Sequence, residues 1–277
     1  MTQPLSPMEI FKLLNKSNCR QCGEATCMAF AAAVFRGEKS LRDCPYLDEQ
    51  TVSKYSQEDE SASLPESQEE QEKLVQQLKS EISSLDLSEA AERVSGELSN
   101  HSLKIYMLGK PVYVFGNGEL YSDIHLNPWV VLPLLHHLLY GTGAQPIGKW
   151  ISFREIQGGM SWNGLFQQRS TKPLKKVLDN YSELFEDVLT IFKGQRVDSQ
   201  FGADIGVVLY PLPKVPVLFN YRKSEEEFES SLHIFFDKTV DSNISIQAAF
   251  SLCTGLVRMF EQIALRHGRH KEAHKRC

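Results

Sequence analysis

The feature that most constrains this chain is a set of four cysteines near its N-terminus, spaced Cys19-x2-Cys22-x4-Cys27-x16-Cys44. Clustered cysteines in a reducing compartment are more often metal ligands than disulfide partners. The remaining cysteines, Cys253 and Cys277, are isolated, and we expect Cys253 to be a small core residue. The spacing therefore predicts one metal centre held by four thiolates.

The residues between these cysteines predict a loop followed by a helix. Gly23, directly after Cys22, lets the backbone pass close to a cluster without a Cβ. Residues 26–37 are rich in alanine and predict a helix ended by Gly37, with Cys27 in or next to its first turn. Unpaired N–H groups and the positive end of the helix dipole favour a thiolate there.

The chemistry of the spacing favours one [4Fe-4S] cluster over zinc. Structural zinc sites prefer two short C-x2-C pairs, and only Cys19 with Cys22 fits that pattern. A zinc site on the same four thiolates is the alternative, and a [3Fe-4S] or [2Fe-2S] product after exposure to air is another.

The run Asn18-Cys19-x-x-Cys22-Gly23-x-x-x-Cys27-x-x-Phe30-Ala31, followed by Gly37 and Cys44-Pro45, resembles a known four-cysteine [4Fe-4S] domain. That domain occurs in the corrinoid iron–sulfur protein large subunit, the acetyl-CoA decarbonylase/synthase gamma subunit and the Rnf complex B subunit. The resemblance covers about residues 6–48. It implies a [4Fe-4S] cluster on Cys19, Cys22, Cys27 and Cys44. The chain departs from the family at Arg20-Gln21, where small or acidic residues are more usual, and this departure could shift the potential or the docking charge.

Charge and hydropathy limit the other classes of function. With 30 basic and 35 acidic residues the net charge is −5, which does not favour nucleic-acid binding. The N-terminus has no basic and apolar signal pattern, and no apolar run reaches the roughly 20 residues that span a bilayer. We therefore expect a cytoplasmic protein without membrane or nucleic-acid partners.

The composition divides the chain into four segments. We expect a cluster domain at 1–48, an acidic linker with a helix at 49–87, a mixed domain at 88–267 and a basic, His-containing tail at 268–277. Residues 48–97 hold 14 acidic and 4 basic residues, a charge of 4 − 14 = −10. Within them, 53–71 predict a solvated tether. A helix is predicted after the tether from the helical spacing of Leu74, Leu78, Ile82 and Leu85. A second helix is predicted from Glu89 to Leu98.

The mixed domain is predicted to have an α+β fold, in which antiparallel hairpins pack with helices. Strands are expected at 103–107, 112–115, 119–122, 205–210, 215–221 and 232–236. Helices are expected at 128–140, capped by Asn127, at 174–192 and at 243–266.

One segment of this domain is a candidate ligand site. The loop predicted at 157–164 holds three glycines and Trp162, and it could wrap a small molecule with Arg154 supplying charge. The competing interpretation, which we favour, is a surface loop whose Trp fills the core. His136 and His137 are adjacent on one helix and point about 100° apart, so they do not suit one metal ion.

Four runs in this region resemble a domain of unknown function from anaerobic bacteria that often follows the same iron–sulfur domain. They are Leu135–Leu139, Gly148–Glu155, Pro211–Pro216 and Phe235–Asp237. The resemblance covers roughly residues 88–266 and implies no activity and no catalytic residue. Nor does the sequence contain a nucleophile elbow, an HExxH motif, a kinase set or a P-loop.

The sequence thus predicts an iron–sulfur protein that transfers single electrons, or a redox accessory protein, in anaerobic metabolism. Its expected partner is a redox protein or an enzyme. The alternatives are an enzyme of corrinoid or one-carbon metabolism whose C-terminal domain binds substrate, and a non-enzymatic iron–sulfur sensor or assembly protein.

Overall fold

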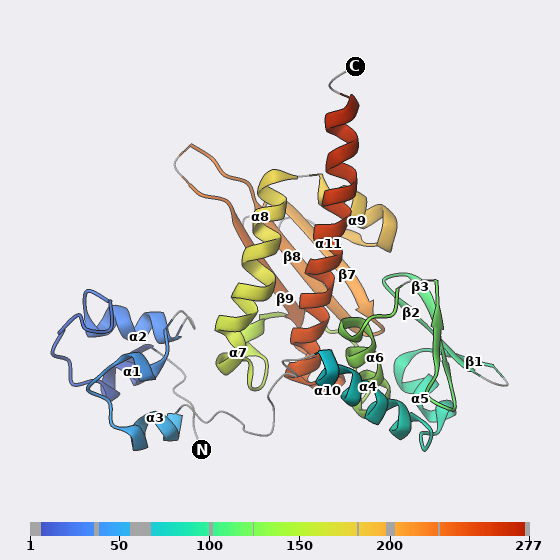
Figure 1. Cartoon of the computed structure of the whole chain (residues 1–277), viewed down its shortest axis with the longest axis horizontal. Coiled ribbons are helices and arrows are strands. Elements are labelled where there is room, and N and C mark those ends of the chain that lie inside the picture. Colours follow the sequence, from blue (N-terminus) through green and yellow to red (C-terminus); the bar gives the residue numbers. More distant parts are fainter. Residues whose placement is uncertain are drawn as a thin grey trace.

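The computed structural model describes residues 7–35, 39–55, 68–99, 102–123, 125–181, 183–197, 203–226 and 228–274. Figure 1 shows a small helical unit, formed by α1 to α3, beside a larger unit of sheets and helices. The fold is α+β, as predicted, because helices pack on sheets in which every described strand pair is antiparallel.

The small unit, which we call the cysteine module (residues 7–55), has its own apolar core. It comprises α1 (Pro7–Leu13), α2 (Cys27–Phe35), a 3₁₀ turn (Leu41–Asp43) and α3 (Glu49–Tyr55). Ile10, Phe30 and Leu41 are buried against one another, and Ala31 has no exposed surface. A small side chain at Ala31 lets α1 and α2 approach closely. The predicted helix end at Gly37 lies outside the described residues.

The first sheet has the order β1-β2-β3-β4. Its strands are β1 (Glu97–Leu98), β2 (Ser102–Met107), β3 (Lys110–Phe115) and β4 (Leu120–Ser122). In register, Leu103 pairs with Val114 and Ile105 with Val112, and all four side chains are buried on one face. The predicted hairpin and the following short strand are confirmed.

The second sheet has the order β5-β9-β8-β7-β6. Its strands are β5 (Trp150–Ser152), β6 (Gln195–Val197), β7 (Ile205–Leu212), β8 (Val215–Arg222) and β9 (Ser231–Asp237). Rows of apolar side chains cross the three central strands: Val207, Phe219 and Ile234, then Leu209, Val217 and Phe236. The predicted strands on β7, β8 and β9 are confirmed, and β6 was not predicted.

Helices cover the face of the second sheet that carries these rows, and α7, α8 and α11 cross it in Figure 1. The remaining helices of the large unit are α4 (Gln68–Ile82), α5 (Leu87–Val94), α6 (Pro128–Tyr140), α7 (Gly159–Phe166), α8 (Lys172–Asn180), α9 (Leu184–Phe192), α10 (Val240–Asn243) and α11 (Ile246–His274). A 3₁₀ turn (Phe153–Glu155) follows β5, and a π-helical turn (Gln167–Thr171) joins α7 to α8. Asn127 stands at the predicted cap of α6 but makes no side-chain capping bond.

One helix in the described part of the chain is long and apolar enough to cross a membrane by length and composition: residues Ile246–Arg266 of α11. In this fold its Phe250, Cys253, Val257 and Phe260 side chains are buried in the main core. Cys253 is therefore a core residue, as predicted.

The predicted single helix over 174–192 is wrong. The chain forms α8 and α9 with a break at Tyr181, whose backbone leaves the helical region (φ −140°, ψ 76°). The Tyr181 hydroxyl group donates to the Asp187 carboxylate, which ties the break to the start of α9.

The acidic segment is more helical than expected. Of the predicted tether 53–71, residues 56–67 lie outside the described residues, and its two ends belong to α3 and α4. Leu78 and Ile82 of α4 are buried in the main core, where α4 packs on α6. The predicted helix from Glu89 to Leu98 is wrong at its end: α5 stops at Val94, where Ser95 turns left-handed (φ 55°), and Leu98 belongs to β1.

Candidate metal centre

All four N-terminal cysteines lie in the cysteine module and carry free thiols. Cys19 and Cys22 stand on the loop after α1, Cys27 is the first residue of α2, and Cys44 directly follows the 3₁₀ turn. Cys27 and Cys44 are buried, and Cys19 and Cys22 are half-buried. Cys22, Cys27 and Cys44 belong to one apolar cluster with Ile10, Leu14, Phe30 and Leu41.

The loop before α2 has an unusual backbone. Lys16, Asn18 and Arg20 have positive φ angles (61°, 50° and 64°), and the residues between them do not. Alternation of this kind is typical of backbone nests, which turn neighbouring N–H groups toward one anion. Within the described residues, the N–H groups of residues 19–22 donate to no protein acceptor. They are therefore available to sulfur atoms.

Gly23 closes this loop with a φ of 84° and donates its N–H to the Arg20 carbonyl group at 3.0 Å. A side chain at this φ would be strained, so the position favours glycine.

Asn18 and Cys27 form a reciprocal pair of hydrogen bonds. The Cys27 N–H donates to Asn18 Oδ1 at 2.7 Å, and the Asn18 N–H donates to Cys27 Sγ at 3.3 Å. The first bond satisfies an unpaired donor at the start of α2, and the second favours the thiolate. Asn18 belongs to the predicted motif, but its role in these two hydrogen bonds was not predicted. The signal was present, because asparagine is favoured both at helix starts and at left-handed positions.

Cys44 is placed by the 3₁₀ turn. Ser40 and Asp43 cap this turn reciprocally: the Ser40 N–H donates to Asp43 Oδ2 at 2.8 Å, and the Arg42 N–H donates to Ser40 Oγ at 3.3 Å. The Cys44 N–H donates to the Leu41 carbonyl group at 3.2 Å. The Cys44 thiol is therefore positioned by a hydrogen-bonded 3₁₀ turn.

This donor set fits an iron–sulfur group. It offers thiols, N–H groups free for sulfur, a helix start with its positive dipole end, and an apolar wall, which are the features that such clusters use. Within the described ranges, no three Cys, His, Asp or Glu side chains are grouped so that they could hold a single metal ion.

The segment predicted as a ligand-wrapping loop is mostly helix. Residues Gly159–Phe166 form α7, and Trp162 packs edge-on against Phe250 at 5.6 Å between ring centroids. The core-filling interpretation of Trp162 is confirmed, and the loop prediction is wrong. Arg154 stacks its guanidinium group 4.7 Å from the ring centre of Phe35, at the end of α2. It therefore links the large unit to the cysteine module.

The two histidines of α6 are separated, as their spacing predicts. His137 is buried, its Nδ1 lies 3.0 Å from the Asn243 carbonyl oxygen, and burial lowers its pKa. His136 is half-buried beside the Tyr140 ring, and burial, with a smaller effect of His137, lowers its pKa to about 4.

Asp237 has a structural role. Its Oδ2 accepts from the N–H groups of Ile147 and Gly148 at 3.0 and 2.7 Å, and its Oδ1 accepts from the N–H and hydroxyl groups of Thr239. Burial alone would raise its pKa, but these hydrogen bonds outweigh burial and lower the pKa.

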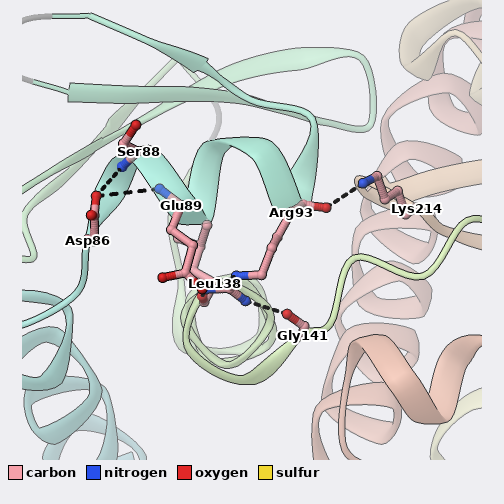
Figure 2. Close-up of polar contacts among 7 residues, drawn as sticks. All are labelled: Asp86, Ser88, Glu89, Arg93, Leu138, Gly141 and Lys214. Carbon is pink, nitrogen blue, oxygen red and sulfur yellow. Dashed lines mark hydrogen bonds and ion pairs between the residues drawn. The ribbon is translucent and has the colours of Figure 1, made fainter.

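Arg93 and Lys214 join three elements of the large unit (Figure 2). The Arg93 guanidinium group donates to the carbonyl oxygens of Leu138, at 2.9 Å, and of Gly141, both at the end of α6. The Lys214 ammonium group, on the β7–β8 turn, donates to the Arg93 carbonyl oxygen at the end of α5. Cations at helix C-termini are stabilising, so this cluster supports the fold.

A surface groove of about 720 Å³ lies between α4, β4 and α6. Its lining combines Glu72, Lys73 and Lys79 with Leu120 and Pro128, and it includes none of the four module cysteines.

Comparison with known proteins separates the two units. Residues 14–46 match a family described as "Putative Fe-S cluster". The chain is 48% identical over 46 residues to the corrinoid/iron-sulfur protein large subunit of Moorella thermoacetica, covering 17% of this chain and 10% of that protein. It is 44% identical over 48 residues to the acetyl-CoA decarbonylase/synthase complex subunit gamma of Methanocaldococcus jannaschii, with coverage of 17% and 10%.

The chain thus spans about a tenth of the length of these curated relatives. No solved structure matches it. The family model of a domain of unknown function (DUF3786) matches residues 86–259, which is most of the chain and most of the large unit. With an iron–sulfur domain at its N-terminus, the chain is an iron–sulfur protein that belongs to the DUF3786 family.

Proposed function

We propose that Cys19, Cys22, Cys27 and Cys44 bind one [4Fe-4S] cluster, and that the protein transfers single electrons between this cluster and a partner protein. Such a cluster supplies one-electron oxidation and reduction. The observation that carries the proposal is the Asn18–Cys27 pair, which places a thiol at the start of α2 with an N–H group directed at its sulfur atom.

The surroundings of the four cysteines support this role. The burial of Cys27 and Cys44 beside Phe30 and Leu41 keeps water from one side of the site. The N–H groups of residues 19–22 have no acceptor in the described part of the chain, and on the other side of the site they lower the cost of added negative charge on a cluster. Both features would tune the reduction potential of a bound cluster while leaving it accessible to a partner protein.

An enzyme of corrinoid or one-carbon metabolism has less support. The relatives that carry those names share only the cysteine region with this chain. The segment that would have formed a substrate site near Trp162 contributes that side chain to the core instead.

The test is a cysteine series in anaerobically purified protein. Each of Cys19→Ser, Cys22→Ser, Cys27→Ser and Cys44→Ser should lose most of its iron and acid-labile sulfide, as measured by chemical analysis. Cys253→Ala is the matched control, because Cys253 is buried in the main core away from the module. It should retain the full content. Full iron and sulfide in all four serine variants would contradict the proposal.

A further inference from the structure

We propose that the exposed side of the cysteine loop docks an acidic one-electron carrier protein through three basic side chains, Lys16, Arg20 and Lys39. This inference rests on the proposed electron-transfer function. It adds the class of partner and the face of the module that this partner contacts.

The burial of the four cysteines defines which side is open. Cys27 and Cys44 are each only 8% exposed, and Cys19 and Cys22 are half-buried on the loop. Because electron transfer weakens steeply with distance, a partner gains most by approaching from the side of Cys19 and Cys22.

Three positive side chains, Lys16, Arg20 and Lys39, belong to this loop or lie against it. Arg20 lies between the two half-buried cysteines and is exposed, as is Lys16, whose ammonium group is 5.5 Å from the centre of the Phe11 ring. The Lys39 ammonium group lies over the loop: a Cβ added to Gly23 would come within 3.3 Å of its Nζ. Within the described residues, none of the three forms an ion pair.

The positive charge is a local property of this face. The loop between α1 and α2 carries Lys16, Arg20 and one acidic residue, Glu24. With Lys39, whose ammonium group lies over this loop, the four side chains sum to 3 − 1 = +2, whereas the whole chain carries −5. At physiological salt, charges more than about 8 Å apart are largely screened, so a docked partner senses mainly the local set. Complementary charge of this kind speeds encounter and orients the partner.

An anionic membrane surface is the competing occupant. Sequence-readable lipid-binding segments usually have about four to eight clustered basic residues. The loop and Lys39 together offer three basic residues beside Glu24, so the observations favour a protein carrier.

The experiment measures electron transfer by anaerobic stopped flow from the dithionite-reduced holoprotein to two protein acceptors of opposite charge. An acidic flavodoxin is the test acceptor and a basic cytochrome c the control acceptor; each gains the one electron that the reduced protein loses. With flavodoxin, raising ionic strength from about 20 to 300 mM should slow transfer about tenfold. Cytochrome c should show no such loss.

A triple variant, Lys16→Gln/Arg20→Gln/Lys39→Gln, should transfer to flavodoxin about tenfold more slowly at low salt while keeping its iron. Lys172→Gln removes an exposed charge from α8 and is the matched control, with an unchanged rate. In a redox titration, Arg20→Gln should also lower the midpoint potential, because a nearby cation stabilises the reduced state.

Two results would overturn the docking proposal: equal rates for wild type and triple variant, or co-sedimentation with phosphatidylglycerol vesicles with no charge effect on flavodoxin transfer. Failure of the underlying function would look different, because that protein would contain no iron and accept no electron from dithionite.

Discussion

At the scale of single residues, Asn18 does the most for the cysteine loop. It adopts a left-handed backbone, caps α2 through its side chain and donates its own N–H to Cys27 Sγ. Few residue types suit all of these conditions, because most side chains are strained at positive φ. We therefore expect Asn18 to govern how firmly the module holds its iron.

Asn18→Gly tests this directly, because glycine keeps the backbone conformation and removes only the capping oxygen. The change leaves the Cys27 N–H without its acceptor, which costs about 1 kcal/mol. Iron should therefore be lost to a chelator about fivefold faster, followed by visible absorbance under anaerobic conditions. Asn18→Asp keeps the acceptor and should restore retention. Gln21→Ala, which removes another exposed loop side chain, is the control. A rate equal to wild type in Asn18→Gly would refute the role.

Asp237 makes stability depend on pH on the acidic side. Its folded-state pKa is lowered, so its contribution is present above the unfolded value of about 3.9 and is lost as the pH falls through the folded value. Asp237→Asn has one acceptor oxygen in place of two, and should lose about 2–4 kcal/mol at pH 7. Urea unfolding at pH 7 and at about pH 3 should show the difference between variant and wild type shrinking with acid. A constant difference would contradict this assignment.

At the scale of elements, α7 shows why part of the chain could not be predicted. Three glycines in residues 157–164 are typical of a loop. In the fold, Gly158 begins the helix with φ 79°, and Gly159 lies where a Cβ would come within 2.0 Å of the Phe153 carbonyl oxygen. Gly159 thus allows its backbone to lie close to the Phe153 carbonyl group, and a local sequence pattern does not reveal such a contact.

Gly159→Ala should therefore destabilise the protein by about 3 kcal/mol or more, because the carbonyl group that it meets is backbone. Gly116→Ala is the matched control, since its added Cβ would meet only Leu87 Cδ1 at 4.0 Å. It should stay within about 0.5 kcal/mol of wild type. Thermal and urea unfolding measure both. Equal stability of the two variants would show that the 159 position tolerates a side chain.

The elements that sequence analysis predicted well carry strong local signals. The strands at 103–107 and 112–115 alternate apolar residues around a tight turn, and α2 begins at Cys27 as its alanine run indicates. The break at Tyr181 depends on its contact with Asp187, and β6 depends on pairing with β7. Such tertiary contacts override local periodicity. The four cysteines were predicted as ligands from their spacing and from the resemblance to a known domain, whereas the hydrogen bonds of Asn18 needed the fold.

At the scale of the whole molecule, polar contacts join the two sheets to each other and to the ends of two helices. The Leu108 N–H donates to the Tyr210 carbonyl oxygen at 2.9 Å and connects the sheets. Arg93 and Lys214 connect the ends of α5 and α6 to the β7–β8 turn (Figure 2). The large unit also places Arg154 against the Phe35 ring of the cysteine module.

Arg93→Met should destabilise the large unit by about 2–3 kcal/mol, because it leaves the Leu138 and Gly141 carbonyl oxygens without their donor. Lys104→Met, which removes a surface ion pair with Glu97, should cost no more than about 1 kcal/mol. Denaturant unfolding compares them. A loss no greater for Arg93→Met than for Lys104→Met would contradict the structural role.

The central claim is that the four thiols of the cysteine module hold one [4Fe-4S] cluster. Mössbauer spectroscopy of ⁵⁷Fe-labelled, anaerobically purified protein, with iron and sulfide analysis, tests it most directly. The account predicts about four iron and four sulfide per chain and the spectrum of a [4Fe-4S]²⁺ cluster. Colourless protein containing zinc or no metal would contradict it.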